Sequence, residues 1–458
     1  MPKLASYYLP GLYVEDHSVE APLDWRGTEP ERAATDGLPA GERIHVFYRT
    51  VCTPENVGRD LPLLVFLQGG PGGQGPRLLS PTSDGWIAEA IKHFRVVLPD
   101  QRGTGRSEHA SAKSIARRGD ARAQADYLKR LLARSIVRDL EHIRLTEFGG
   151  RAWTTLGQSY GGFLTLTYLS FYPQGIAASF TCGGIPHVPA SAADVYAHTF
   201  PRMAAKTRAY YARYPEDEAR MAAVAGRLAT GDVTLPDGSP LTPRRLQTLG
   251  GGLGMKPAPE RLHNLLDTAF ETGDGSPACA GSTPELTDGF LMAALQNLTT
   301  AGNPLYWTLQ EFIYANGTLD VPIRWAAEHE YARHPEFDAA ARPLMLTGEA
   351  AFPFMFEDDP LLAPLKPAVD LLMEDTEFDE IYDERQLATN EVPLQAAVYF
   401  DDLYVDSGLQ LDTLSRVATS HAWVTNEFEH DGLHGSVVFA HLFEEALGRG
   451  DLERALRS

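Results

Sequence analysis

Two short apolar runs near the start of the chain show the pattern of strands that are covered on both faces. Residues 61–67 form a continuous apolar run that ends in glycines, and residues 94–99 form another. An unbroken apolar run is typical of a strand in a parallel sheet, because helices cover both faces of such a sheet. Residues 44–51 are rich in β-branched and aromatic side chains, and we expect the region 11–60 to supply strands at the sheet edge.

Helical spacing replaces this pattern over residues 124–147. The apolar positions there are separated by charged residues: Leu128, Leu131, Leu132, Ile136, Leu140 and Ile143. This spacing predicts an amphipathic helix. Strand-like residues follow at 151–156 and 178–182, with a helical run at 162–169 between them. The alternating order predicts βαβ crossovers, and therefore an α/β fold with a mainly parallel sheet and helices on both of its faces.

The pattern changes after residue 184. Residues 185–345 are rich in Ala, Arg, Tyr and Pro, with helical stretches such as 203–213 and 216–229. Glycine- and proline-rich interruptions separate these stretches, so we interpret the segment as a mostly helical insertion. Such an insertion is a natural cap over a site at the carboxyl ends of the strands, where open α/β sheets bind ligands.

Strand character returns near the C-terminus, at residues 391–400 and 421–426. A closing helix is expected over 436–447, with Ser436 as its candidate N-cap. The sequence therefore predicts an N-terminal core part, an inserted helical cap and a C-terminal core part, which occupy residues 1–184, 185–345 and 346–458.

Composition and charge narrow the range of functions. The chain has 458 residues and a formal net charge of −21, which argues against nucleic acid or an anionic membrane as partner, because both need a basic face. The three cysteines, Cys52, Cys182 and Cys279, show no metal-ligand spacing, and their low, odd number favours a reducing compartment. We expect neither a metal nor another cofactor. The chain shows no signal-peptide-like run and no stretch near the ~18 apolar residues of a membrane span, so we expect a soluble cytoplasmic protein.

The most informative short motif is Gly157-Gln158-Ser159-Tyr160-Gly161, which lies between a predicted strand and a predicted helix. A nucleophile elbow requires this context, because a sharp strand-to-helix turn exposes the serine oxygen. The helix N-terminus beneath the serine also favours developing negative charge. Ser159 is therefore the candidate nucleophile.

A serine nucleophile needs a base within hydrogen-bond reach and an acid that orients the base. Behind a serine elbow, the acid and then the base follow on loops after late strands. The strand-like run that ends at Phe400 is followed by Asp401, Asp402 and, a little later, Asp406. This pattern leaves all three open as the acid, because Asp after a strand is also a common turn residue.

The candidate base lies after the last predicted strand, in a loop that contains glycine. His430 and His434 compete for this role. His421 and His441 are less well placed, because they fall inside a predicted strand and a predicted helix.

The run Gln68-Gly69-Gly70-Pro71-Gly72-Gly73 directly follows the predicted strand at 61–67. A loop at this place supplies one donor of an oxyanion hole, and the N–H of the residue after the nucleophile supplies the other. Gly70 and Tyr160 are therefore the candidate donors, and losing one such donor costs about 2.7–4 kcal/mol of transition-state stabilisation. The later run 100–107 lacks the Gly-Lys-Ser/Thr ending of a phosphate-binding loop, and we interpret it as a structural turn beneath the active site.

Five motifs extend from the glycine-rich loop to the C-terminal region: Gly-Gly-Pro-Gly at 69–72, Asp-Gln-Arg-Gly at 100–103, Gly-Gln-Ser-Tyr-Gly-Gly at 157–162, Tyr-Phe-Asp-Asp-Leu-Tyr-Val-Asp at 399–406 and Thr-Asn-Glu-Phe-Glu-His-Asp-Gly-Leu at 425–433. Together they resemble the prolyl aminopeptidase (proline iminopeptidase) family of α/β-hydrolase serine peptidases, in particular its longer-chain branch with a large helical cap. The last two motifs are the specific ones. The chain departs from the family pattern at Gln68, where many relatives have His, and at His434, where Arg is expected.

The resemblance implies an α/β-hydrolase fold with Ser159 as nucleophile, Asp402 as acid and His430 as base. It also implies that glutamates of the cap hold the free imino group of an N-terminal proline. Glu311, in the run 309–314, is the candidate for this role, and its alternative is a surface charge of a helix. The expected function is a serine aminopeptidase that releases N-terminal proline from small peptides through an acyl-enzyme.

Two other functions stay open at this point. An esterase or lactonase would use the same scaffold, because a fold does not fix the substrate. A non-catalytic hydrolase-like binding protein would lack one triad member or the oxyanion glycines, whereas this chain keeps all of the candidates.

Overall fold

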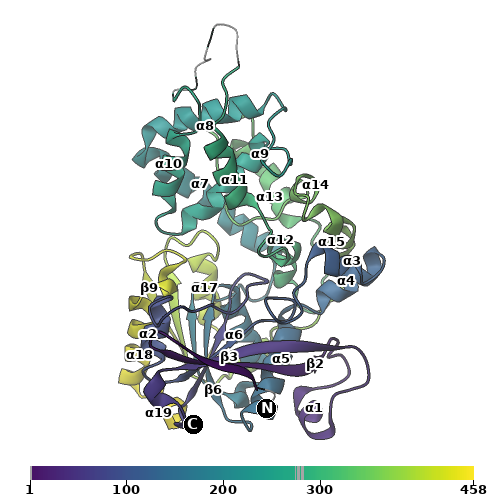
Figure 1. Cartoon of the computed structure of the whole chain (residues 1–458), viewed down its shortest axis with the longest axis vertical. Helices are drawn as coiled ribbons and strands as arrows, with labels where there is room; N and C mark the ends of the chain where they lie inside the picture. Colours follow the sequence, from purple (N-terminus) through teal and green to yellow (C-terminus); the bar gives the residue numbers. More distant parts are fainter. Residues whose placement is uncertain (1–2, 274, 276–278, 280–282, 458) are drawn as a thin grey trace.

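The computed structural model describes residues 3–273, 275, 279 and 283–457. Within these residues the centre is a nine-stranded sheet with the order β1-β2-β3-β5-β4-β6-β7-β8-β9 (Figure 1). Its strands are β1 (Lys3–Leu9), β2 (Leu12–Pro22), β3 (Arg43–Cys52), β4 (Leu63–Leu67), β5 (Arg95–Pro99), β6 (Trp153–Gln158), β7 (Ile176–Cys182), β8 (Leu394–Tyr399) and β9 (Ser420–Thr425). The pairs β1–β2, β2–β3 and β3–β5 are antiparallel, and every other neighbouring pair is parallel. The predicted mainly parallel sheet is confirmed, and the region 11–60 supplies strands toward one edge.

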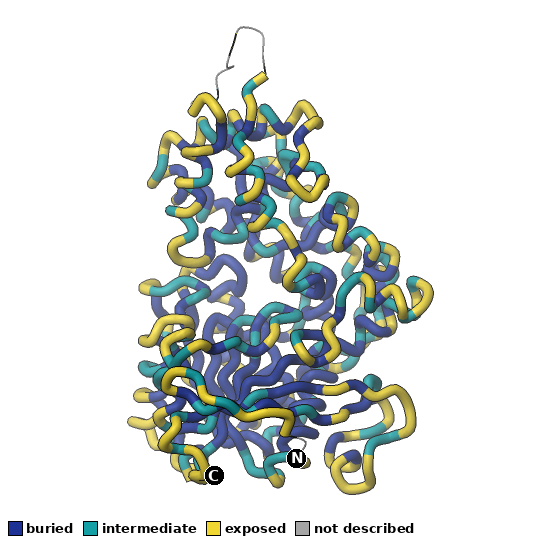
Figure 2. Tube along the Cα trace, in the orientation of Figure 1, coloured by how far each residue is buried: buried dark blue, intermediate teal, exposed yellow. Residues whose placement is uncertain are grey.

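Alternate residues of β4 pack against helices on opposite faces of the sheet. The even-numbered residues belong to a core cluster with α2 (Gly85–Ala90), α18 (Val437–Arg449) and α19 (Glu453–Arg457). The odd-numbered residues belong to a second cluster with α5 (Ala133–Glu147) and α6 (Tyr160–Phe171). This two-sided burial explains the unbroken apolar run in the sequence and confirms helices on both faces. Figure 2 shows that the strands in the middle of the sheet are buried.

The single helix expected over 124–147 is wrong, because the chain forms α4 (Ala121–Lys129) and then α5. The buried guanidinium of Arg102 lies at the break. Its Nη1 donates to the carbonyl of Arg130 at 2.8 Å, and its Nη2 lies 2.6 Å from Asp139 of α5. A buried charge needs such partners, and the spacing of apolar residues does not report a tertiary contact of this kind.

The chain leaves the sheet after β7 and returns at β8, and we call the intervening residues 183–393 the cap. Most of its helices gather beyond one end of the sheet (Figure 1). They are α7 (Ala192–Arg213), α8 (Pro215–Leu228), α9 (Pro243–Gln247), α10 (Ala258–Asp267), α11 (Asp288–Leu298), α12 (Leu305–Leu309), α13 (Ala326–Arg333), α14 (Met355–Asp358), α15 (Lys366–Met373) and α16 (Glu384–Ala388). Helices continue past residue 345, the expected end of the insertion, and α15 and α16 pack against α4 and α6 of the core. The last part of the cap therefore leads back to the sheet.

Three further helices lie outside the cap: α1 (Pro30–Asp36), α3 (Ala112–Ala116) and α17 (Ser407–Leu414). The expected closing helix is α18, and Ser436 occupies its N-cap position, although the Ser436 side chain makes no capping hydrogen bond. Within the described part of the chain, no helix combines the length and the apolar character that crossing a membrane requires.

Candidate active site

Ser159 lies at the turn between β6 and α6, as the elbow motif predicts. Its φ of 54° is a strained value for a residue other than glycine. Neighbouring backbone passes very close, since a Cβ on Gly157 would lie 2.3 Å from the carbonyl oxygen of Gly161, and one on Gly161 would lie 1.8 Å from that of Leu67. The two glycines are therefore required by space, and they allow the turn that presents the serine at the N-terminus of α6.

The candidate acid and base meet after β8 and β9. His430 Nδ1 lies 2.8 Å from Asp402 Oδ2. The other carboxylate oxygen of Asp402 accepts hydrogen bonds from the N–H of Tyr404 at 2.8 Å and of Val405 at 3.0 Å, and its side chain is fully buried. A carboxylate fixed in this way can orient an imidazole whose Nε2 accepts the proton of a nucleophile.

The competing acid and base candidates have other partners. Asp401 is exposed. Asp406 caps α17 and forms an ion pair with Arg202. His434 pairs with Asp84 at 3.1 Å, and 48% of its side chain is exposed. The geometry therefore keeps these candidates apart from the acid–base pair described above.

The surroundings of His430 favour its charged form. Burial alone would lower the pKa of His430, because it penalises the imidazolium ion, but the Asp402 carboxylate raises it and Glu349 and Asp431 add to this effect. The net pKa of His430 is raised above its ordinary value. A raised pKa suits a group that takes a proton in one step and returns it in the next.

The cap also holds the loop that carries His430. The N–H of His430 donates to the carbonyl of Gly254 in the cap at 3.0 Å. Beside it, the ammonium group of Lys206 in α7 lies 2.6 Å from the Glu429 carboxylate. The position of the candidate base therefore depends on the cap as well as on the sheet.

Two consecutive glycines after β7 lie beside the serine and the acid. A Cβ on Gly184 would lie 2.3 Å from the carbonyl oxygen of Ser159, and one on Gly183 would lie 3.1 Å from Asp402 Oδ2. Because neighbouring Cα atoms are about 3.8 Å apart, the serine and the acid–base pair share one end of the sheet. Among the described residues no hydrogen bond joins the Ser159 hydroxyl to His430. In free enzymes this bond is often long and tightens when substrate binds.

The glycine-rich run after β4 forms a loop, Gly69–Gly73, which we call the oxyanion loop. It lies against the candidate nucleophile, since a Cβ on Gly69 would be 3.0 Å from Ser159 Cβ. Gly70 has a φ of 127°, which glycine adopts without steric cost. In the described part of the chain, neither the N–H of Gly70 nor that of Tyr160 donates a hydrogen bond to another protein group. Unused donors beside a serine are what an oxyanion hole requires.

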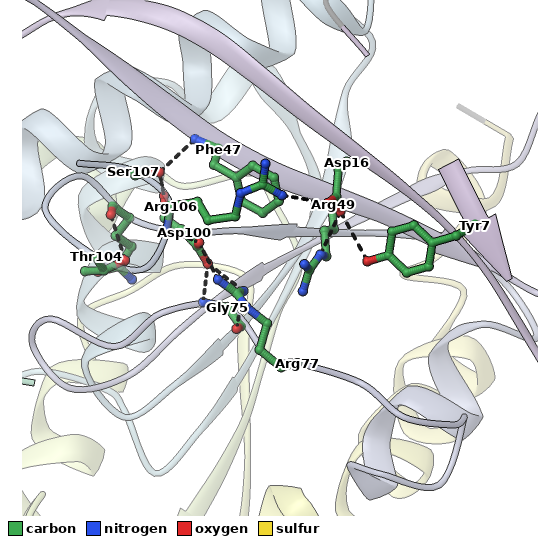
Figure 3. A network of polar contacts seen from close by, with 11 residues as sticks. Tyr7, Asp16, Phe47, Arg49, Gly75, Arg77, Asp100, Thr104, Arg106 and Ser107 are labelled. Carbon is green, nitrogen blue, oxygen red and sulfur yellow. Dashed lines mark hydrogen bonds and ion pairs between the residues drawn. The ribbon is translucent and has the colours of Figure 1, made fainter. Parts of the chain in front are cut away.

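The Asp-Gln-Arg-Gly run forms a turn that anchors both ends of this loop. Figure 3 shows Asp100 beside Gly75 and Arg77, which follow the loop. Asp100 is fully buried, and its carboxylate accepts hydrogen bonds from the Gly75 N–H at 3.0 Å and from the two Nη atoms of Arg77 at 2.8 and 2.6 Å. The Gln101 side chain donates to the carbonyl of Gln68 at 2.8 Å. This arrangement agrees with the interpretation of the run as a structural turn.

Glu311, the candidate for amino-group binding, has no exposed surface. Its two carboxylate oxygens accept hydrogen bonds from the N–H groups of Ala326 and Ala327, each at 2.9 Å, at the N-terminus of α13. Burial raises the pKa of Glu311 to about 8, although these two hydrogen bonds act in the opposite direction. The alternative that Glu311 is a surface charge is therefore wrong.

Glu349 is a second cap carboxylate, and the sequence reasoning missed it. Its side chain accepts a hydrogen bond from the hydroxyl of Tyr306 in α12, and the residue stays partly exposed. Burial raises the pKa of Glu349, while Tyr306 and the nearby His430 lower it without cancelling the effect. The available signal was that Glu349 is the one charged residue in the apolar run 343–356.

Cysteine thiols are a further kind of side chain that can act as nucleophiles. Cys52 and Cys182 are buried thiols, and burial raises the pKa of Cys182, which makes it a poor nucleophile. Among the residues that the structure describes, no group of three or more His, Cys, Asp or Glu side chains is arranged to hold a metal ion.

Residues 62–217 match the family model of the alpha/beta hydrolase fold, and with the sheet and the serine elbow this makes the chain an α/β-hydrolase. A proline iminopeptidase from Aeromonas sobria is 40% identical over 428 residues, which cover 93% of this chain and 94% of that protein. The proline iminopeptidase aneH from Aspergillus aculeatus is 32% identical over 419 residues, which cover 90% of each chain. The chain belongs to the proline iminopeptidase family, as its motifs imply.

Solved structures show a weaker likeness. Esterase E22 covers 94% of this chain and 98% of its own, with a TM-score of 0.45 and 12% sequence identity. A likeness of this size carries no argument about the substrate.

Proposed function

We propose that this protein is a serine aminopeptidase that releases proline from the N-terminus of small peptides, with Ser159, His430 and Asp402 as its catalytic triad. The observation that carries the proposal is the 2.8 Å contact between His430 and Asp402, at the end of the sheet where the strained serine elbow lies. The chain order of the three residues supports the triad. The similarity to named proline iminopeptidases supports the activity.

In the proposed reaction the Ser159 hydroxyl attacks the carbonyl carbon of the N-terminal proline, and His430 Nε2 takes its proton. Asp402 orients the imidazole and stabilises the imidazolium ion that forms. The N–H groups of Gly70 and Tyr160 bind the oxyanion of the tetrahedral intermediate. His430 then protonates the leaving amine, and the same imidazole activates a water molecule that hydrolyses the acyl-enzyme.

An aminopeptidase must also bind the free amino group of its substrate. We propose Glu349 as the carboxylate in contact with this group, because it is partly exposed and close enough to His430 to raise its pKa. Tyr306 holds the Glu349 carboxylate in place through a hydrogen bond. Glu311 remains the proposal from the sequence, as a further carboxyl group of the same cluster. Burial raises the pKa of the Tyr314 hydroxyl, and both Glu349 and Glu311 add to this effect, so the two side chains lie near the same ring.

The test compares proline-p-nitroanilide with p-nitrophenyl acetate. We expect hydrolysis of both compounds and labelling by a fluorophosphonate probe, and we expect Ser159→Ala to abolish turnover and labelling. His430→Gln and His434→Gln form a matched pair, of which the first should be inactive and the second should stay close to the wild type. Ester cleavage without proline-amide cleavage would favour an esterase or lactonase. A folded wild-type protein that the probe does not label would favour a non-catalytic binding protein.

The proposed substrates are small peptides with N-terminal proline. The net charge of −21 supports the prediction that neither nucleic acid nor an anionic membrane is a partner. The cytoplasmic location is also kept as a prediction, and cell fractionation with an antibody against the protein would test it.

A further inference from the structure

The oxyanion loop is enclosed between the core and the cap. On the core side, the Asp100 turn anchors its ends, as described above. On the cap side, Asn303 Nδ2 donates a hydrogen bond to the carbonyl of Pro71 at 2.9 Å. Gly72 has no room for a side chain, since a Cβ there would lie 2.3 Å from Asn303 Oδ1 and 2.6 Å from the Cβ of Leu305. The loop therefore packs directly against the start of α12.

Among the described residues, the Asn303 side chain makes one hydrogen bond, and its acceptor is the carbonyl of Pro71. Its Oδ1 is buried and has no hydrogen-bond partner among the described residues. Most buried side-chain polar atoms have a hydrogen-bond partner, so a buried amide oxygen without one calls for an explanation. The bond from Nδ2 to Pro71 is the polar contact that joins this side chain to the oxyanion loop.

Asn303 belongs to the same short segment that carries the candidates for amino-group recognition. Three residues later, Tyr306 donates a hydrogen bond to Glu349, and Glu311 lies a little further along the same segment. One segment of the cap therefore contacts the oxyanion loop at one end and the carboxylate cluster at the other.

We propose that Asn303 is a positioning residue that holds the oxyanion loop in its working geometry and couples the loop to amino-group binding in the cap. The inference rests on the proposed roles of the Gly70 N–H and of Glu349. The ring of Pro71 fixes its φ, so a fixed Pro71 carbonyl also restricts the backbone of Gly70 beside it. A substrate ammonium held by Glu349 steadies the segment that carries Asn303, and the donor is then in place when the oxyanion forms.

The experiment uses Asn303→Ala and Asn303→Asp in the full-length protein. The aspartate keeps the shape of the side chain but removes the donor and places a carboxylate oxygen against the Pro71 carbonyl. We expect kcat for proline-p-nitroanilide and the rate of fluorophosphonate inactivation to fall by about 10- to 100-fold. This fall should not exceed the one that follows when an oxyanion donor itself is removed. KM should stay nearly unchanged. The aspartate variant should be the more affected.

The control is Asn297→Ala. Asn297 is an exposed asparagine of the same cap, on α11, and its side chain donates to the carbonyl of Ala293 in its own helix. This variant should keep the wild-type kcat and labelling rate. Circular dichroism and urea unfolding show which variants are folded, so that a loss of kcat in folded enzyme is separated from a loss of protein.

A double-mutant cycle with Glu349→Gln tests the coupling. Asn303→Ala should reduce proline-amide turnover less in the Glu349→Gln background than in the wild type, and its effect on p-nitrophenyl acetate should be the same in both. Folded Asn303 variants with wild-type kcat and labelling rate would overturn the positioning role, and additive effects would overturn the coupling. Failure of the proposed function would give a different result from failure of the positioning role. The wild type itself would then leave proline-p-nitroanilide intact, and the labelling rates of the Asn303 variants would still test the positioning role.

Discussion

The core and the cap place their functional side chains by different means. In the core, the candidate nucleophile, acid and base each follow a strand of one sheet, after β6, β8 and β9. Parallel strands end at the same edge, so residues far apart in the chain meet there. In the cap, Glu349 accepts a hydrogen bond from Tyr306, and Asn303 donates one to the carbonyl of Pro71, so side-chain contacts place them.

This difference explains which part of the site short motifs reveal. An elbow or a post-strand loop needs particular residues at fixed spacing, because the backbone itself makes the geometry. A carboxylate held by one tyrosine needs no neighbouring residue of a special kind. The proposed chemistry is therefore visible in local sequence, whereas the proposed recognition depends on tertiary contacts.

The largest effect should come from the core. Asp402→Asn should lower kcat for proline-p-nitroanilide by about 10⁴-fold, because the imidazole loses the partner that orients it and stabilises its charge. The neighbouring Asp401→Asn is the matched control and should stay within about threefold of the wild type, since Asp401 is exposed. Steady-state kinetics would check both variants. A larger loss of kcat in the Asp401 variant would identify Asp401 as the acid.

The next effect separates the two cap carboxylates. Glu349→Gln should lower kcat/KM for proline-p-nitroanilide by about 100-fold, because the substrate ammonium loses a charged partner that is worth about 2–5 kcal/mol. Turnover of p-nitrophenyl acetate should change little, since this ester carries no amino group. Glu311→Gln should have the smaller effect on the proline amide, because Glu311 is fully buried. A larger effect of Glu311→Gln than of Glu349→Gln on the proline amide would identify Glu311 as the contact with the amino group.

Glu311 should also give the protein a measurable pH dependence of stability. Its pKa of about 8 lies above the ordinary 4.5, so the folded state binds the proton more tightly than the unfolded state. The resulting stabilisation is complete below pH 4.5 and is lost as the pH rises through 8. Urea unfolding should show the free energy of unfolding falling between pH 5 and pH 8 by about 3–4 kcal/mol more in the wild type than in Glu311→Gln. Equal falls would mean that Glu311 is already ionised in the folded protein.

The smallest effect concerns the pH profile of catalysis. The base must be neutral to accept a proton, and the pKa of His430 is raised, so activity should be lost on the acid side at a higher pH than an ordinary histidine would give. Glu349→Gln removes one of the charges that raise this pKa and should shift the acid limb to lower pH. p-Nitrophenyl acetate is the right substrate, because it has no titrating amine. An unchanged limb would place Glu349 outside the electrostatic reach of the base.

Much of the core could be predicted from the sequence, because the spacing of apolar residues and the place of a motif after a strand are local features of the chain. The run 61–67 and the serine elbow lie where the pattern predicts them. The choice between Asp401 and Asp402 was not accessible from residue type, since adjacent residues after a strand point in different directions. The break between α4 and α5 lies at the contacts of the buried Arg102, and the periodicity of apolar residues does not report such contacts. Glu349 was missed for the same reason, because its role depends on residues far away in the chain.

The hydrogen bond from the backbone of His430 to Gly254 has a consequence for engineering and for divergence within the family. A shortened enzyme without the insertion would lose an acceptor that supports the proposed base, so trimming should impair ester and amide hydrolysis alike. A chimera with a foreign lid must therefore supply an equivalent carbonyl at that spot before any new specificity can be selected.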